Sequence, residues 1–430
     1  MKLNHLHNLR LGIFPVMLGL TSVLMGGAVN RVMIVELGIP TSLVGLFFSL
    51  PLLISPIRIW LGYRSDAYPL WGLRREPFII LGALLASLGT VGIILTMFRI
   101  NDIDRVGVLA AGFTFLLYGF GRSLSSNTFE ALQADKFKGD QRPRAVAFLK
   151  VAMFLGIIGG SVLLGRALEP FSFDRLLLVV VAVAVISTLL SVISVVYQEP
   201  RTEGARSESE QARNVPFLET FKTYIWPDRQ VRMFFIFVML TVIGTLAQDV
   251  ILEPYAALVL GMSVGETTRL MAVWGSGTLL AMLSAGAWLI RRYGYGPVLK
   301  FGLWLGVLIF IGLIISGILV STPLFLVLVF FLGLSTGFSA AAMLTAVIDF
   351  TTPERAGLLM GVWGLAHGFG QALGSLLSGA LVDLAFLFQS SVLTAYGFVF
   401  ALEAVLLIIA LGLYSRIRIS QAKVFAEAQT

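Results

Sequence analysis

The sequence predicts an all-α membrane protein with twelve transmembrane helices in two six-helix bundles. Three observations lead to this fold class: 57% of the residues are hydrophobic, only 13% are charged, and the mean hydropathy is +0.90. Charged residues make up about a quarter of an ordinary soluble domain, which has no use for so much apolar surface. The 430 residues are therefore divided among membrane spans of roughly 20 residues each.

Apolar runs of spanning length place each helix in turn. The expected helices cover residues 10–35, 41–63, 77–98, 106–133, 145–168, 174–197, 232–259, 265–290, 298–320, 323–348, 355–382 and 392–415. The long polar segment after the sixth helix divides them six plus six. We expect an N-terminal bundle over 1–197, a cytoplasmic linker over 198–231, a C-terminal bundle over 232–415 and a cytoplasmic tail over 416–430.

The linker and a weak internal repeat support this division. Phe217, Phe221 and Tyr224 recur at helical spacing before Pro227, which is typical of a short interfacial amphipathic helix, with a docking site for a partner as the alternative. Residues 119–135 match 333–349 in length and in several Gly, Ser and Asp positions. Such a repeat fits two parallel bundles related by an axis along the membrane normal, with any cavity between them.

The charge distribution orients the chain and excludes several classes of function. Most of the 31 Lys and Arg residues fall at one face of the bundle, and the other face receives Arg31, Arg99, Arg105, Arg166, Arg175 and Arg269. The positive-inside rule then predicts that both termini are cytoplasmic, as an even number of spans requires. Because the net charge of +7 is spread over membrane-edge loops, we do not expect nucleic-acid binding.

Catalysis is not expected from this sequence either. There is no cysteine, which excludes disulfides, thiolate metal sites and cysteine nucleophiles. No phosphate loop, zinc-ligand spacing, nucleophile elbow or dinucleotide fingerprint occurs in a suitable context. The sequence predicts a protein that is not an enzyme and that holds no metal of its own.

Ionisable residues at membrane depth are candidate functional residues, because they are costly there and face protein or water. Arg31 and Glu253 both lie near the outer ends of their helices, and Asp249 shares a helical face with Glu253. Two carboxylates at this spacing repel unless a cation or proton intervenes. We expect an outer cluster in which Arg31 pairs with Asp249 or Glu253; the alternative is a group of charges at headgroup level without a partner.

The fourth predicted helix carries a second set of polar residues. Arg122 and Glu130 follow one face, with Asn127 beside it, and Glu130 is too distant for direct contact with Arg122. Arg122 therefore either contacts another helix or coordinates a bound carboxylate or carbonyl. Arg58, one turn from the cytoplasmic end of the second helix, is expected to snorkel or to pair with Glu130 or Asp135.

The eleventh predicted helix offers a candidate pigment site. His367 is the one histidine within a predicted span, and Gln371 lies one turn along the same face. A neutral imidazole is a plausible axial ligand for the magnesium of a chlorophyll, whereas hydrogen-bonded packing is the alternative. The same helix carries Gly361, Gly364, Gly368, Gly370, Gly374 and Gly379, a smooth face that favours close helix packing and that could also accept a flat tetrapyrrole.

Several sequence blocks resemble known families. Gly-Tyr-Arg-Ser-Asp at 62–66, ending in Asp66, followed by Gly-Leu-Arg-Arg at 72–75 resembles the signature loop of the major facilitator superfamily. Asn-Arg-Val-Met-Ile-Val-Glu-Leu-Gly-Ile-Pro at 30–40, Gln-Asp-Val-Ile-Leu-Glu-Pro-Tyr at 248–255 and Glu-Arg-Ala-Gly-Leu at 354–358 resemble the PucC/LhaA family. The blocks fall in both halves, so the resemblance covers nearly the whole chain.

The resemblance implies a function in photosynthetic membranes. Members of that family assist the assembly of light-harvesting complexes and are thought to deliver or handle (bacterio)chlorophyll. It implies chlorophyll or bacteriochlorophyll as cargo, and antenna polypeptides or reaction-centre assembly intermediates as partners, in a photosynthetic or cytoplasmic membrane. The rival interpretation is a secondary transporter of an anionic or amphipathic solute, with Arg122 and Glu130 on its path.

Overall fold

The structure is a computed structural model that describes residues 9–53, 70–100, 105–137, 139, 141–199, 229–350 and 356–417. Within these ranges the regular structure is helical, apart from an isolated bridge between Leu70 and Leu73. Eleven of the described helices are long and apolar enough to cross a membrane, and Thr41–Leu53 is a shorter apolar helix beside them. The predicted all-α, multi-pass membrane fold is confirmed, and the described helices fall within or close to the predicted spans, of which residues 54–63 of the second lie outside the described residues.

The chain packs as two compact units. Unit 1 comprises Met1–Ile39, Leu50–Arg213 and Met262–Ala272, and unit 2 comprises Pro40–Ser49, Asn214–Gly261 and Val273–Thr430. Each unit follows one predicted bundle, except that 40–49 pack with unit 2 and 262–272 pack with unit 1. The greater part of the predicted linker lies outside the described residues.

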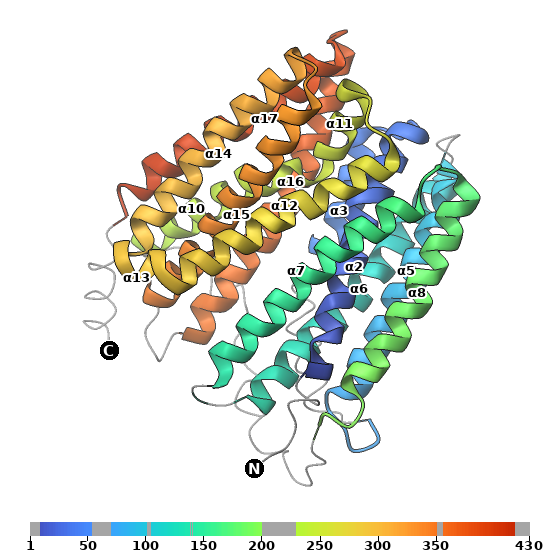
Figure 1. The fold of residues 1–430 in the computed structure, drawn as a ribbon, viewed down its shortest axis with the longest axis vertical. Helices are drawn as coiled ribbons and strands as arrows, with labels where there is room; N and C mark the ends of the chain where they lie inside the picture. Colours follow the sequence, from blue (N-terminus) through green and yellow to red (C-terminus); the bar gives the residue numbers. More distant parts are fainter. Residues whose placement is uncertain are drawn as a thin grey trace. The chain divides into compact units, whose positions relative to one another are not determined.

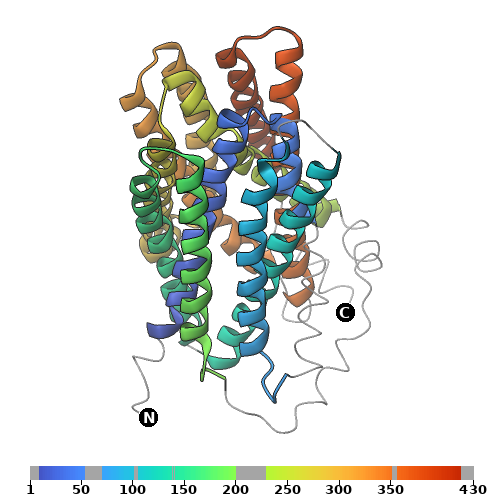
Figure 2. The same ribbon diagram turned by 90° about the vertical axis from the view of Figure 1, so that its right-hand side faces the viewer.

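The described helices of unit 1 correspond to the first, third, fourth, fifth and sixth predicted spans. Its helices are α2 (Ile13–Val23), the π-helical segments η1 (Leu24–Val29) and η2 (Val32–Glu36), α5 (Glu76–Met97), α6 (Arg105–Lys136), α7 (Gln141–Ala167) and α8 (Phe173–Val195). α2 packs on α7 and α8, and α5 packs on α6 and α8 (Figure 1). Figure 2 shows α5 in blue and α8 in green running side by side. The four helices α2, α5, α6 and α8 surround the site described below.

Unit 2 contains the remaining spans. Its helices are α3 (Thr41–Leu53, through Ser49), α10 (Arg229–Leu246), the 3-10 segment η6 (Ala247–Val250), α11 (Leu252–Leu260), most of α12 (Val264–Ser284), the π-helical η7 (Ala285–Leu289), α13 (Ile290–Tyr293), α14 (Tyr295–Ile318), α15 (Thr322–Phe350), α16 (Ala356–Leu387) and α17 (Val392–Tyr414). α14 packs on α15 and α17, and α10 packs on α16 and α17.

The seventh span departs from its prediction, because it is interrupted rather than continuous. α10 ends at Leu246, a single 3-10 turn follows, and α11 begins at Leu252. Pro254 lies in the first turn of α11 and has no N–H to donate to the carbonyl four residues earlier. A proline is therefore compatible with the start of an α-helix but would break its interior. α11 then ends at Gly261, whose φ of +69° is the left-handed conformation that glycine adopts without strain.

The glycine-rich face of α16 packs against neighbouring helices of its own unit. A Cβ on Gly379 would lie 2.4 Å from the Thr41 carbonyl oxygen, and a Cβ on Gly45 would lie 2.4 Å from the Ser375 carbonyl oxygen. A Cβ on Gly374 would lie 3.2 Å from the Cβ of Ala247. At these positions the packing interpretation of the glycine face is confirmed, and the face is covered where a flat tetrapyrrole would need it free.

One substitution tests the close packing of α2 on α7 in unit 1. A Cβ on Gly156 would lie 2.2 Å from the Val16 carbonyl oxygen, whereas a Cβ on Gly159, in the same helix, would meet nothing within 4 Å. We expect Gly156→Ala to destabilise the protein by about 1–3 kcal/mol, since backbone has to move. Gly159→Ala should be neutral or stabilising by up to about 1 kcal/mol. Thermal unfolding of the two variants in detergent measures the difference, and equal midpoints would contradict this packing.

Candidate functional site

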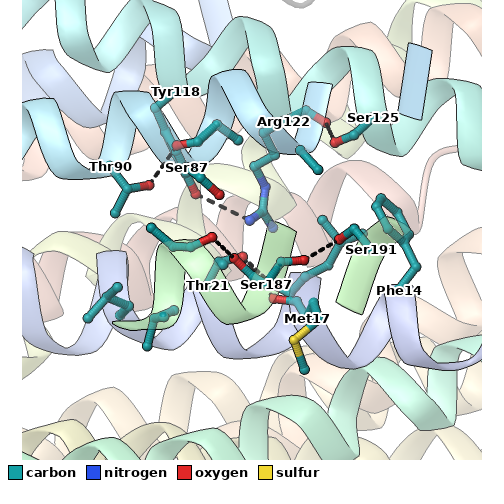
Figure 3. A pocket seen from close by; sticks show the side chains of 16 residues that line it. Phe14, Met17, Thr21, Ser87, Thr90, Tyr118, Arg122, Ser125, Ser187 and Ser191 are labelled. Carbon is teal, nitrogen blue, oxygen red and sulfur yellow. Dashed lines mark hydrogen bonds between the residues drawn. The ribbon is translucent and has the colours of Figure 1, made fainter. Parts of the chain in front are cut away.

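A pocket in unit 1 lies among α2, α5, α6 and α8. Sixteen residues line it: Phe14, Met17, Leu18, Thr21 and Leu24 on α2 and η1; Ala83, Ala86, Ser87 and Thr90 on α5; Tyr118, Arg122 and Ser125 on α6; and Val183, Ala184, Ser187 and Ser191 on α8. Figure 3 shows these side chains, with the Arg122 guanidinium pointing into the pocket. Most of the lining is apolar or carries a hydroxyl group, and Arg122 is its one ionisable side chain besides Tyr118.

Arg122 brings an uncompensated positive charge to this pocket. Its Nη2 donates to the Ser22 hydroxyl at 2.8 Å, and its Nη1 donates to the Tyr118 hydroxyl at 3.2 Å. Among the residues that the structure describes, no carboxylate forms an ion pair with it. A guanidinium has five N–H donors, so neutral hydroxyls leave both its charge and part of its donor capacity available to a bound group.

The pocket hydroxyls complement this cation. Ser187, Ser191 and Thr21 each donate to a carbonyl of their own helix, at 3.2, 2.6 and 3.0 Å respectively. A hydroxyl whose proton is used in this way still offers its oxygen lone pairs as acceptors. The pocket can therefore hold a polar group that accepts from Arg122 and donates to a serine, surrounded by apolar walls such as Phe14 and Val183.

The size of the pocket limits what it can take. The volume of the pocket that the centres of water molecules can occupy is about 30 Å³, which is room for roughly two water molecules. Including its open side, the empty space is about 480 Å³. In this conformation the pocket accommodates a carbonyl, a carboxylate or a similarly small polar end of a ligand, and a whole tetrapyrrole ring does not fit beside Arg122.

Of the two roles considered for Arg122, contact with another helix is present through Ser22 on α2. Asn127 and Glu130, the other two polar residues predicted as candidates on this helix, do not line the pocket, and Glu130 is exposed. Arg58 and Asp66 lie outside the described residues. Asp135, proposed as a partner for Arg58, forms an ion pair with Arg75 at 2.9 Å.

Arg31 has a partner within unit 1, whereas Asp249 and Glu253 belong to unit 2, so the predicted pairing of Arg31 with either acid stays a prediction. Arg31 is buried and forms an ion pair with Glu36, five residues further along its own span, and its Nη2 also donates to the Met262 carbonyl at 3.4 Å. Asp249 instead accepts from the Gln371 amide at 3.4 Å. The π-helical geometry of this span brings Glu36, five residues after Arg31, close enough to neutralise it locally.

His367 and Gln371 lie on α16 in unit 2. The His367 ring packs against the Trp363 ring, with their centroids 5.6 Å apart and an angle of 35° between the planes. Gln371 uses its amide nitrogen on Asp249. Ligation of a pigment magnesium by His367 or Gln371 stays a prediction.

A pair of reciprocal carboxylate contacts, which the sequence did not suggest, fixes one edge of unit 1. The Glu76 carboxylate accepts from the backbone N–H groups of residues 197, 198 and 199, at 3.1, 2.6 and 2.6 Å. The Glu199 carboxylate accepts from the N–H groups of residues 74, 75 and 76, at 2.8, 2.8 and 3.3 Å. This arrangement, the Glu76–Glu199 clamp, joins the start of α5 to the chain that leaves α8.

A polar network also joins 262–272 to the rest of unit 1. Glu169, in the connection after α7, accepts from the Ser263 hydroxyl at 2.7 Å and from the Arg269 guanidinium at 2.7 Å. The Ser263 hydroxyl and the Arg269 guanidinium hold the pKa of the Glu169 carboxyl below its ordinary value of 4.5, against a smaller opposing effect of burial.

This network gives an acid-dependent contribution to stability. A carboxyl whose pKa is lowered by folding stabilises the protein at any pH above its ordinary value, and that contribution is lost as the pH falls through the lowered value. We expect the thermal midpoint of the wild-type protein to fall toward that of Glu169→Gln as the pH is lowered below 4.5. Glu130→Gln, at an exposed position, is the control. A constant difference between wild type and Glu169→Gln across this range would contradict the assignment.

The comparisons with known proteins agree with one another. The family described as PUCC protein matches residues 28–422. The chain belongs to this family. Protein PucC of Rhodobacter capsulatus is 32% identical over 419 residues, which cover 94% of this chain and 90% of that protein. The bacteriochlorophyll synthase 44.5 kDa chain of the same organism is 30% identical over 417 residues, covering 95% of each.

Solved structures show the fold of this PUCC family member. The nucleoside transporter NupG, in a mutant form, has a TM-score of 0.76 at 15% identity, covering 96% of this chain and 99% of that one. A bacterial homologue of the lysosomal transporter Spinster has a TM-score of 0.70 at 14% identity, covering 96% and 97%. At such identities the likeness concerns the fold alone, which is of the major facilitator type.

Proposed function

We propose that this protein is an assembly factor of photosynthetic membranes that binds light-harvesting polypeptides and delivers or handles (bacterio)chlorophyll. The match to the PUCC family over residues 28–422 carries the proposal. It is supported by a relative named as a chain of bacteriochlorophyll synthase that aligns over 95% of the chain. The protein would handle the pigment without transforming it, in a photosynthetic or cytoplasmic membrane and with both termini in the cytoplasm.

The Arg122 pocket supplies a physical means of holding such a ligand by its edge. Chlorophylls carry keto and ester carbonyl groups at the periphery of an apolar ring, and these groups accept hydrogen bonds but do not donate them. Arg122 is a charged donor with spare capacity between apolar walls and hydroxyls. A carbonyl at this position would anchor the pigment while its ring lies outside the small pocket, with His367 or Gln371 as candidate ligands elsewhere in the chain.

A second candidate function is secondary transport of an anionic or amphipathic solute. The uncompensated charge of Arg122 suits a carboxylate as well as a carbonyl, and the fold is one that transporters use. The two candidates differ in the size and colour of the ligand, and in whether a polypeptide accompanies it.

Gentle purification of the tagged protein from pigmented cells separates these functions. We expect absorption bands of bacteriochlorophyll in the purified sample and antenna polypeptides identifiable by mass spectrometry. A parallel preparation of an unrelated tagged membrane protein from the same cells corrects for loosely associated pigment. Proton- or sodium-driven uptake of a small anion into vesicles, together with a colourless and partner-free preparation, would favour transport and reject the assembly function.

A further inference from the structure

The interrupted seventh span carries two carboxyl groups, and α17, which packs against α10 and α11 in unit 2, carries a third. Asp249 lies in the 3-10 turn η6, and Glu253 lies in the first turn of α11. Glu403 lies in α17, Val392–Tyr414, eleven residues from each end of the helix (403 − 392 and 414 − 403). At about 1.5 Å per residue it is some 16 Å from either end, at the depth where a charge is most costly.

Among the described residues, Glu253 and Glu403 are buried acids with carboxylate oxygens that have no hydrogen-bond partner. They are 3% and 1% exposed. Neither Glu403 Oε1, Glu403 Oε2 nor Glu253 Oε2 has a hydrogen-bond partner, and no described Lys, Arg or His forms an ion pair with them. The side-chain oxygen of Gln248, a residue that is 1% exposed, is also an acceptor without a donor.

These buried oxygens without hydrogen-bond partners would be stabilised by a bound proton or cation. An ionised carboxylate without a partner in an apolar interior has a prohibitive solvation cost, and such a group takes up a proton instead. The described residues contain no group of three Asp, Glu, His or Cys side chains placed to hold a metal ion.

Few other charges face this site. α17 packs against α10, α11, α14 and α16. The ionisable residues of those helices are Arg229 and Arg232 on α10, Glu253 and Tyr255 on α11, Tyr295 and Lys300 on α14, and His367 and Asp383 on α16. Lys300 lies 5.9 Å from the Tyr414 ring, at the far end of α17. Asp383 accepts from the N–H groups of Thr41 and Ser42. None of these residues neutralises Glu403.

We propose that the break in the seventh span is a proton-binding site, in which Glu403 and Glu253 carry protons at neutral pH and Asp249 exchanges them with water. Asp249 is exposed and accepts a hydrogen bond from Gln371, so it is the one of the three acids that can exchange protons outside the core of unit 2. The Gln248 side-chain oxygen is an acceptor for a protonated carboxyl. The site uses no residue of the Arg122 pocket, and it stands whether the cargo is a pigment or another solute.

Infrared spectroscopy of the full chain in lipid nanodiscs tests this site. A protonated carboxyl has a carbonyl stretching band that is separate from the carboxylate bands and shifts in D2O. We expect such bands at neutral pH, a loss of intensity in Glu403→Gln, a second loss in Glu253→Gln, and no loss in Glu130→Gln at an exposed site of α6. Glutamine keeps the shape of each side chain, and thermal unfolding confirms that the variants fold.

Two results would overturn the proposal. The first is a neutral-pH spectrum without protonated carboxyl bands, or one that Glu403→Gln and Glu253→Gln leave unchanged. The second is the loss of those bands on addition of NaCl but not of choline chloride, which would assign the site to sodium. Because every measurement is made on protein without pigment, failure of the assembly function leaves this test unaffected.

Discussion

Arg122→Met is expected to abolish most of the binding of bacteriochlorophyll while leaving the fold intact. Methionine fills a similar volume but removes the one cation of a pocket whose other polar groups are hydroxyls. A hydrogen bond from a charged donor contributes about 1.5–3 kcal/mol, so affinity should fall roughly 10- to 150-fold. Quenching of tryptophan fluorescence by detergent-solubilised bacteriochlorophyll measures the dissociation constant.

Two further variants make this test specific. Arg105→Met removes an exposed arginine from the same helix and should bind as wild type does. Arg122→Lys keeps the charge but loses the planar fork that reaches Ser22 and Tyr118 together, so an intermediate affinity is expected. Wild-type affinity in Arg122→Met would remove the pocket from the ligand-binding account.

Glu76→Ala is expected to produce the largest loss of stability. The substitution leaves three backbone N–H groups, those of residues 197, 198 and 199, without their acceptor. At about 1 kcal/mol for each hydrogen bond, the loss is about 3 kcal/mol, which corresponds to a decrease of roughly 6–12 °C in the unfolding midpoint. Thermal unfolding in detergent, followed by light scattering and intrinsic fluorescence, measures it.

The reciprocal geometry of the Glu76–Glu199 clamp predicts non-additivity. Glu199→Ala releases the segment 74–76, and once either side has been released the other carboxylate has less structure to hold. The double variant should therefore lose less stability than the sum of the two single losses. Full additivity would show that the two carboxylates act independently, and Glu130→Ala, at an exposed site, is the control for loss of a glutamate.

The helical architecture could be predicted from the sequence, because a segment in lipid must be apolar and must form all its backbone hydrogen bonds within itself, as an α-helix does. The break at 247–251 was not predicted, although Pro254 marked it, because a proline near a helix end is compatible with a continuous span as well. The small-residue face of α16 was correctly interpreted as packing at Gly374 and Gly379, where the close contacts depend on size alone, whereas a Cβ on Gly364 would meet nothing within 4 Å.

The site was predictable only in part. Arg122 was identified because a charge inside an apolar run is conspicuous, whereas Tyr118, Ser187 and Ser191 were missed. Serines 187 and 191 recur at helical spacing in an otherwise apolar span, a usable signal. Glu403, alone among apolar residues of the last span, was equally visible.

Contacts that join distant parts of the chain were beyond the sequence. Glu76 and Glu199 are 123 positions apart, and each accepts hydrogen bonds from backbone N–H groups rather than pairing with a charged side chain. No pattern of side chains in the sequence could therefore predict these contacts. The ion pair of Arg31 with Glu36 was not predicted for a similar reason, since the π-helical geometry that brings the two residues together is not visible in the sequence.

Near-infrared absorption of membranes from a phototrophic strain that lacks this gene tests the assembly function most directly. Restoring the wild-type gene should restore the antenna absorption bands, whereas Arg122→Met, expressed at the same level, should leave them largely absent. Full antenna bands in the strain without the gene, and in the absence of any other member of the PUCC family, would contradict the account.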